Sequence, residues 1–387
     1  MNNFPATQTI FPFPGIYGVM NDDKENIPFR NTEYLIVGQG LAGTMLAYEL
    51  HRRGKDFIVV DNPSGEKASQ VAAGIINPVV FRRLTKSWLV DDLFPVLKET
   101  YGELEGLLSC RLLHSLKIDK ILGKEETPFW HSKVIENELE SYILPEPDDN
   151  FQIDGIVAPY GVGKVFNAFR VDLPLLIRRF REFLMRENQF ISEKLDTNDV
   201  NRESGKVQWK NITARKIIFC QGFRASENPF FQPVKFKHTK GQVLDLEIPY
   251  LKITDMVNKG MFVLPLGDNH FRAGATYRWE FHDTKPDDEA TEELTEKLEK
   301  VVKLPYSVAG KRAGIRPTSH DRRPVVGLHP DYPEIGIFNG LGSKGAMLAP
   351  YFAREFMRFL CGESDAIHPE VNLLRYYRKN NRLRNRF

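Results

Sequence analysis

The sequence predicts an α/β protein in which a Rossmann-like dinucleotide-binding domain is interleaved with an α+β domain built on an antiparallel sheet. Three observations predict it. An apolar run at 34–37 stops at a glycine-rich turn, and apolar residues then recur at helical spacing up to Arg53. A second apolar run follows at 57–60, which completes a strand–helix–strand unit. Further along, between 235 and 281, apolar and polar residues alternate as they do in antiparallel strands.

The first turn has the spacing of a dinucleotide-binding motif. Its sequence, Gly38-Gln39-Gly40-Leu41-Ala42-Gly43, matches G-x-G-x-x-G, in which the glycines allow a tight turn, close approach of a pyrophosphate and packing of helix on strand. Asp61 ends the second strand, where a carboxylate accepts hydrogen bonds from a ribose diol and disfavours a 2′-phosphate. FAD and NAD remain as ligands, and an ordinary turn aspartate is the alternative interpretation of Asp61.

A second strand, glycine loop and helix lie near the C-terminus. The strand at 335–339 is followed by Gly340-Leu341-Gly342-Ser343-Lys344-Gly345 and then by an apolar helix at about 346–360. Too little chain follows for a second nucleotide unit. We expect this loop to direct backbone N–H groups and a helix N-terminus at partial negative charge, such as the N1 and C2 carbonyl side of a reduced flavin. An ordinary turn between strand and helix is the alternative.

Composition excludes several classes of protein. The 387 residues suffice for two domains, and 53 basic against 51 acidic residues give no global argument for a polyanionic partner. Cys110, Cys220 and Cys361 lie far apart, which argues against a zinc site, a redox-active disulfide and a secreted disulfide framework. No apolar stretch is long enough for a membrane span, and the start lacks a signal-peptide pattern. We therefore expect a cytoplasmic protein without a metal site.

Patterns along the chain suggest domain boundaries. Helical patterning dominates 86–143, a long amphipathic helix is expected at 173–188, and a charged helix at 287–302. From these patterns we expect an N-terminal extension at 1–30, a dinucleotide-binding domain from 31–85, 151–230 and 305–365, a second domain from 86–150 and 231–304, and a basic tail at 366–387.

A further segment, Ser69-Gln70-Val71-Ala72-Ala73-Gly74, combined with the 340–345 loop, resembles the D-amino-acid-oxidase-like FAD-dependent oxidoreductases over 34 to about 360. In that family the serine lies by the FAD phosphates and the small residues pass close to the isoalloxazine. Gly222 ends a strand similar to the family's strand near the adenosine, and Leu195 closes the strand before it. The resemblance implies a Rossmann-like FAD-binding domain, with FAD contacts from Gly38, Gly40, Leu41, Ala42, Gly43, Asp61, Ser69, Ala72, Ala73, Gly74, Leu195, Gly222, Gly340, Gly342, Ser343, Lys344 and Gly345.

The same family suggests the catalytic residues. Gly314-Ile315-Arg316-Pro317 resembles the segment whose arginine holds the substrate carboxylate in glycine oxidase, and a planar guanidinium suits a carboxylate. A solvated basic loop is the alternative for Arg316. Lys344 and His320 are candidates for oxygen activation or proton handling, although either can be an exposed side chain. The resemblance implies oxidation of the C–N bond of a small amine or amino acid by hydride transfer to flavin N5, with O2 or a quinone as acceptor.

One branch of the family binds FAD covalently through a cysteine near the segment aligned with 314–321. No cysteine lies there in this sequence, so noncovalent FAD is expected.

A second resemblance suggests another substrate. The loop at 341–345 differs only by lysine for arginine from that of the FAD-dependent oxidase half of the bifunctional enzyme that makes 5-methylaminomethyl-2-thiouridine in tRNA. By this resemblance the substrate is the carboxymethylaminomethyl group of a wobble uridine, with tRNA as partner. Phosphate contacts would come from Arg82, Arg83, Lys86, Trp88, the helix at 178–186 and the basic tail. The near-neutral net charge weakens this alternative, and a flavin-binding protein without turnover or an NAD-binding module is a third.

Overall fold

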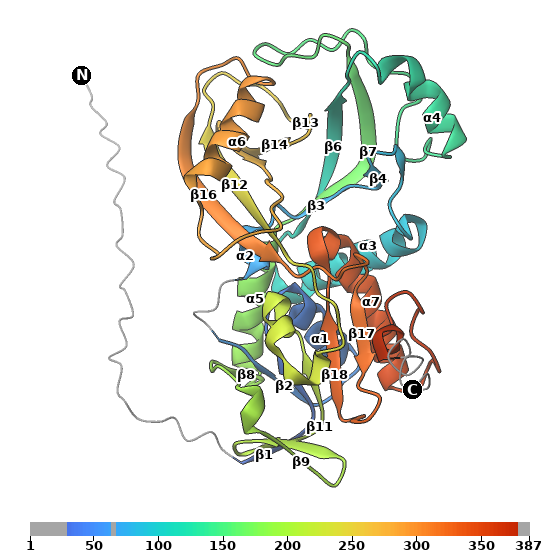
Figure 1. The fold of residues 1–387 in the computed structure, drawn as a ribbon, viewed down its shortest axis with the longest axis vertical. Coiled ribbons are helices and arrows are strands. Elements are labelled where there is room, and N and C mark those ends of the chain that lie inside the picture. Colours follow the sequence, from blue (N-terminus) through green and yellow to red (C-terminus); the bar gives the residue numbers. More distant parts are fainter. Residues whose placement is uncertain (1–28, 63–66, 378–387) are drawn as a thin grey trace, which may run out of the picture.

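Two large β-sheets, one above the other in Figure 1, organise the computed structural model, which describes residues 29–62 and 67–377. The lower sheet carries the predicted strand–helix–strand unit, and the upper sheet contains the alternating strands of 239–274. The chain passes between the sheets several times, so neither is built from one continuous segment.

The first sheet is mainly parallel. Its strand order is β17-β18-β11-β1-β2-β8, with β17 antiparallel at one edge and a β9–β10 hairpin attached to β11. The strands are β1 (Arg30–Val37), β2 (Phe57–Val60), β8 (Phe190–Ile191), β9 (Val200–Glu203), β10 (Lys206–Trp209), β11 (Ile212–Phe219), β17 (Val325–Leu328) and β18 (Ile335–Asn339).

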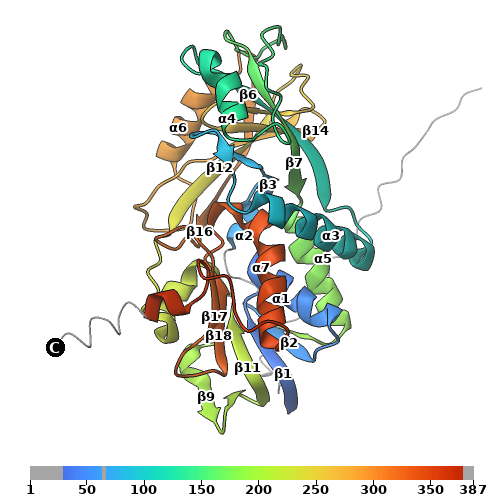
Figure 2. The ribbon, with the colours of Figure 1, turned by 90° about the vertical axis from the view of Figure 1, so that its right-hand side faces the viewer.

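The central strands are apolar on both faces because both faces are covered. Ile36 and Val59 belong to one apolar cluster, while Leu35 and Ile58 belong to another on the opposite side of the sheet. Four helices cover the first face (Figure 2), namely α1 (Leu41–Arg52), α3 (Val90–Leu108), α5 (Leu173–Arg186) and α7 (Gly345–Leu360). The predicted helices at these places are confirmed.

The second sheet has the order β16-β12-β15-β14-β13-β6-β7-β3 and is antiparallel except for the β6–β13 pair. Its strands are β3 (Ile75–Ile76), β6 (Leu113–Ile121), β7 (Val162–Val171), β12 (Thr239–Glu247), β13 (Met256–Asn258), β14 (Phe262–Gly267), β15 (His270–Gly274) and β16 (Ser307–Arg316). Helix α6 (Asp288–Glu299) packs its Leu294 and Leu298 against this sheet. The predicted α/β fold with an antiparallel second sheet is therefore confirmed in its class.

The expected domain boundaries need correction at three places. β7 lies within 151–230 and β16 within 305–365, yet both pair in the second sheet. Helix α3, expected in the second domain, packs on α7 in the first. In β7 the alternation of buried residues is broken where the register shifts and Asn167 takes a φ of +54°, so this strand lacks the periodicity that predicts one.

The C-terminal region also differs from the expected basic tail. Within 366–377, Leu373 is buried and donates a backbone hydrogen bond to Val326, and Arg375 is paired with Asp321. This part of the predicted tail is packed on the first domain because its apolar side chains complete the second face of the sheet. The extension at 1–28 and residues 378–387 lie outside the described residues. None of the helices in 29–62 and 67–377 is long and apolar enough to span a membrane.

Candidate active site

A cavity of about 530 Å³ lies between the two sheets. Its lower part is lined at the carboxyl ends of β1, β2, β11 and β18, where open α/β sheets bind their ligands. Its upper part is lined by residues of β12, β14 and β16. The volume is in the range of cofactor and ligand sites.

The first glycine motif is shaped by close backbone contacts. Gly38 has a φ of +101°, and a Cβ there would lie 2.6 Å from the carbonyl oxygen of Cys220. A Cβ on Gly43 would lie 1.8 Å from the carbonyl oxygen of Gly38, so both positions need glycine. Helix α1 then begins at Leu41 without a side-chain cap. Its N-terminus opens into the cavity as a site for an anion.

Ser69 joins this turn from a distant segment. Its Oγ accepts a hydrogen bond from the backbone N–H of Leu41 at 3.0 Å, so the serine expected by the phosphates does lie at the N-terminus of α1. Gly74, with a φ of +70°, follows a few residues later. A Cβ there would lie 1.9 Å from the carbonyl oxygen of Val171, which explains why the segment needs glycine where it crosses β7.

Asp61 lines the cavity, but its carboxylate already has protein partners. One oxygen accepts the backbone N–H of Gln39 at 3.0 Å, and the other lies 2.8 Å from the guanidinium of Arg181 and 2.7 Å from Nζ of Lys67. Arg181 also donates to the buried side-chain carbonyl of Gln39. A carboxylate has about four acceptor positions, so Asp61 is braced by the protein and keeps capacity for a ribose hydroxyl.

The second glycine loop places another helix N-terminus at the cavity. Gly342 has a φ of +58°, and α7 begins at Gly345 without a side-chain cap. Nζ of Lys344 donates to Oγ of Ser87 at 2.5 Å. Burial lowers the pKa of Lys344 to about 8, because desolvation penalises its charged form. Two helix N-termini, neither capped by its own N-cap residue, and this lysine therefore face one cavity.

Arg316, at the end of β16, lines the upper part of the same cavity. Its guanidinium donates to the carbonyl oxygen of Thr276 at 3.3 Å, and its Cζ lies 5.0 Å from the ring centre of Tyr277. Among the described residues no carboxylate lies within ion-pair distance of it. Burial lowers the pKa of Arg316, because desolvation penalises the charged guanidinium. Gly241 makes room for it, since a Cβ there would lie 2.1 Å from a guanidinium nitrogen.

Most of the site residues expected from the sequence line this cavity together, and three do not. Gly43 and Gly340 pack behind the loops that they shape, against Gly38 and Val325 respectively. His320 is exposed, and its ring lies 5.7 Å from that of Tyr376, so its place beside the reacting groups was wrongly expected. The cavity is lined by Gly38, Gly40, Leu41, Ala42, Asp61, Ser69, Ala72, Ala73, Gly74, Leu195, Gly222, Arg316, Gly342, Ser343, Lys344 and Gly345.

Several residues of the site were missed. Gln39 and Arg181 brace Asp61, and the amphipathic pattern of the α5 helix gave no sign of this role. Asn339 ends β18 and links two loops, because its side chain donates to the carbonyl oxygen of Gly222 and accepts from the N–H of Gly340. Met256 and Phe262, from strands far apart in the sequence from the glycine motifs, line the upper part of the cavity.

The residues present fit FAD on structural grounds. A dinucleotide needs an anion site beside an acidic ribose contact, and the N-terminus of α1 with Asp61 supplies both. A flavin needs donors near its pyrimidine edge, and the N-terminus of α7 with Lys344 supplies them. Cys220, which also lines the cavity, lies beside Gly38 at the pyrophosphate end rather than beside Arg316.

Comparison with known proteins decides the family. The model of the FAD-dependent oxidoreductase family DAO matches residues 33–358. The chain belongs to this family. FAD is therefore its cofactor, and the enzyme is an FAD-dependent oxidoreductase.

The relatives of this DAO-family enzyme include proteins named for amine oxidation. Glycine oxidase of Pseudomonas aeruginosa is 24% identical over 357 residues, which cover 87% of this chain and 96% of the relative. A tRNA 5-methylaminomethyl-2-thiouridine biosynthesis bifunctional protein of Campylobacter jejuni is 22% identical, with 77% of this chain matching 46% of that protein. Among solved structures, iminodiacetate oxidase from a Chelativorans species has a TM-score of 0.73 at 17% identity, covering 88% of this chain and 98% of that one.

Proposed function

We propose that this enzyme oxidises the C–N bond of a small amine that carries a carboxylate. The observation that carries the proposal is Arg316, a buried cation that lines the cavity without an acidic partner among the described residues. A buried charge is costly unless it is paired. A carboxylate on the substrate would supply that pair, with two parallel hydrogen bonds to the guanidinium.

The residues around the cavity could contact the different parts of such a substrate. Bound FAD supplies the acceptor for the hydride that leaves the carbon beside the nitrogen. Arg316 fixes the carboxylate and therefore the position of that carbon, which lowers the entropic part of the barrier. The N–H groups at the start of α7 and the cation of Lys344 stabilise negative charge that develops at the cofactor ring. Loss of the hydride converts the neutral amine of the substrate into an iminium ion.

The names of two relatives support this substrate class. Glycine and iminodiacetate both carry an amine one carbon away from a carboxylate, and the proteins named for their oxidation resemble this chain over most of its length. We also propose that FAD is held noncovalently, since none of the three cysteines lies in 314–321. Release of intact FAD on heat denaturation is the expected result, and a flavin that stays with the precipitated chain would contradict it.

The first prediction concerns Arg316. Anaerobic titration of the FAD-loaded enzyme with glycine, sarcosine, proline and D-amino acids is expected to bleach the flavin absorbance with at least one of them. Arg316→Lys keeps the charge but loses the two-pronged hydrogen bond, so the dissociation constant of that amine should rise by roughly 10- to 100-fold. No bleaching with any carboxylate amine, or unchanged binding in Arg316→Lys, would contradict the proposal.

A pair of glycine variants gives a second test of Arg316 and its control. Gly241→Ala places a methyl group 2.1 Å from a guanidinium nitrogen of Arg316, so it should displace the arginine and weaken amine binding without changing any charge. Gly310→Ala lies on the neighbouring strand, where the nearest atom would be 3.7 Å away, and binding should stay at the wild-type value.

A second candidate function is oxidation of a modified base in tRNA. The observation in its favour is the β4 (Val79–Val80) and β5 (Thr85–Lys86) hairpin, whose tip carries the exposed Arg82 and Arg83 beside the cavity-lining Phe81. Other expected phosphate contacts are engaged, since Lys86 pairs with Asp91 and Arg323 covers Trp88. The chain spans less than half of the bifunctional relatives.

That candidate has its own test. Hypomodified tRNA should bind with an affinity that falls steeply with salt, and Arg82→Ala combined with Arg83→Ala should reduce the salt slope. Release of glyoxylate from the tRNA is the activity to measure. Absence of both binding and glyoxylate would exclude it.

A further inference from the structure

A pair of exposed aromatic rings begins next to the arginine of the cavity. Tyr277 and Trp279 are 43% and 39% exposed, and their ring centres are 5.3 Å apart at an interplanar angle of 77°. The ring of Tyr277 lies 5.0 Å from Cζ of Arg316, and Nζ of Lys237 lies 4.4 Å from the ring centre of Trp279. A continuous series of side chains therefore leads from the buried guanidinium to the surface.

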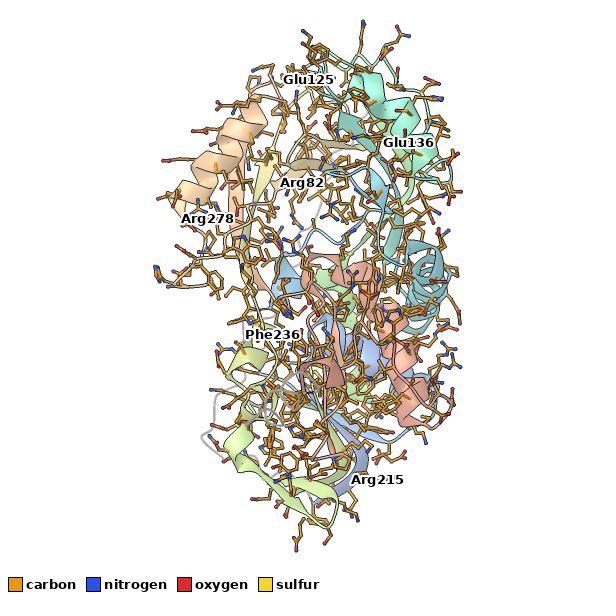
Figure 3. All side chains as sticks on the ribbon, turned by 45° about the vertical axis from the view of Figure 1, so that its right-hand side comes forward. Arg82, Glu125, Glu136, Arg215, Phe236 and Arg278 are labelled. Atoms are coloured by element: carbon orange, nitrogen blue, oxygen red, sulfur yellow. The ribbon has the colours of Figure 1, made fainter. Side chains whose placement is uncertain are left out.

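The backbone explains why both rings lie on the same side of the segment after β15. The segment after β15 pairs with β12, since Lys240 and Arg278 exchange two backbone hydrogen bonds. Side chains in such a segment alternate between its two sides. Arg278 lies on the outer side, beside α6 (Figure 3), and it pairs there with Glu289. Its neighbours Tyr277 and Trp279 therefore point to the opposite side, where Tyr277 meets Arg316.

The rings form a corner suited to a planar group. Aromatic pairs prefer offset-stacked or edge-to-face geometry, and two rings at nearly a right angle offer a third ring one face and one edge at once. Large aromatic side chains are costly to leave exposed to water. Both rings remain exposed in the protein; Tyr277 adjoins the arginine that we assign to the substrate carboxylate, and Trp279 adjoins Tyr277.

We propose that Tyr277 and Trp279 form a subsite for a planar ring carried by the nitrogen substituent of the substrate. This inference rests on the proposed function and narrows it: the substrate class is a ring-bearing N-substituted glycine rather than free glycine. With the carboxylate on Arg316 and the reacting carbon in the cavity, the remaining substituent of the nitrogen extends past Tyr277 toward Trp279. Lys237 completes the subsite at its outer end.

The test compares two amines that differ in the ring. Anaerobic calorimetric titration of the FAD-loaded enzyme with N-benzylglycine and with sarcosine gives two dissociation constants. N-benzylglycine should bind at least about tenfold more tightly, the ratio that roughly 1.4 kcal/mol of stacking produces. Trp279→Ala should lower the ratio of the two dissociation constants about tenfold. Trp279→Phe should restore most of the preference for N-benzylglycine. Tyr250→Ala removes an exposed tyrosine from the loop between β12 and β13 and should keep the wild-type ratio.

Binding and reduction of the flavin separate the two proposals. Equal affinity for both amines, with bleaching by both, would overturn the ring subsite and leave amine oxidation standing. A ring preference that Trp279→Ala removes, without bleaching by either amine, would support the subsite and overturn amine oxidation.

A third titration identifies the source of the ring. It uses tRNA with a carboxymethylaminomethyl group on its wobble uridine, and binding that Trp279→Ala weakens would make the ring a nucleobase. Binding that depends on salt alone, together with equal constants for the two small amines, would overturn the subsite.

Discussion

Lys344 has a charge that depends on its place in the cavity. Its Nζ is held by Ser87, whose own hydroxyl donates to the backbone carbonyl of Asn77. No carboxylate is among the causes that shift its pKa, and burial alone lowers that pKa to about 8. The lysine is therefore protonated below about pH 8 and loses its charge as the pH rises through that value. In the proposed role, its cation can therefore stabilise negative charge at the cofactor ring only below about pH 8.

The charge of Lys344 predicts the direction in which Lys344→Met shifts the flavin midpoint potential. The variant lacks the cation at every pH, so its flavin midpoint potential at pH 7 should lie below that of the wild type by about 30 mV, a tenfold effect for two electrons. The difference should disappear above about pH 9, where the wild-type lysine is neutral. Spectroelectrochemical titration at several pH values measures it. Lys194→Met removes a lysine that lines the cavity beside Leu195 and should leave the potential unchanged; equal potentials for Lys344→Met and wild type at pH 7 would refute the role.

At the scale of elements, helix α5 braces the nucleotide-binding turn. Arg181 reaches from the helix to Asp61 and Gln39, and the side-chain amide of Gln39 donates back to the carbonyl of Ile177 in the same helix. The helix thus fixes both the turn after β1 and the acid after β2. A preorganised site binds its ligand more tightly because less freedom is lost on binding.

Loss of this brace should weaken FAD binding. Arg181→Met is expected to raise the dissociation constant of FAD about tenfold, since Asp61 loses a charge-assisted hydrogen bond. Fluorescence titration of the apoprotein with FAD measures the constant. Arg179→Met, which removes an exposed arginine that pairs with Glu182 on the same helix, is the matched control. Equal affinity in both variants would show that the brace has no part in cofactor binding.

Helices and strands could be predicted from the sequence where their formation depends on residues close together in the chain. The unit from β1 to Asp61 was recognisable because strand, turn and helix each have a local pattern. The segments that form β7 and β16 were assigned to the dinucleotide-binding domain because pairing between distant strands leaves no local pattern, and the shift at Asn167 removed the alternation. His320 was misplaced for a similar reason, since its side chain turns toward Tyr376, far along the chain.

At the scale of the whole molecule, the cavity exists only because the two sheets meet. The glycine motifs identified much of its lower half, where many of the lining residues belong to a motif in the sequence. The upper half comes from strands such as β14, whose Phe262 lines the cavity. The sequence alone does not show whether this side chain faces the cavity or α6. Gly314 of β16 lies where a Cβ would be 3.4 Å from Ala68 and Val71, so the second sheet packs closely on the segment that carries Ser69, beside the cavity.

FAD is therefore expected to stabilise both sheets together. A ligand at 100 times its dissociation constant adds about 2.7 kcal/mol to the free energy of unfolding, which for a chain of this size should raise the thermal midpoint by roughly 2–5 °C. Hydrogen exchange followed by mass spectrometry locates the effect. Peptides from β12 and β16 in the second sheet should gain protection on FAD binding along with the turn before α1, because the cavity is lined by all three. The β9–β10 hairpin, whose residues do not line it, should not. Protection confined to the first sheet would mean that the second sheet closes on the cofactor site only when substrate binds.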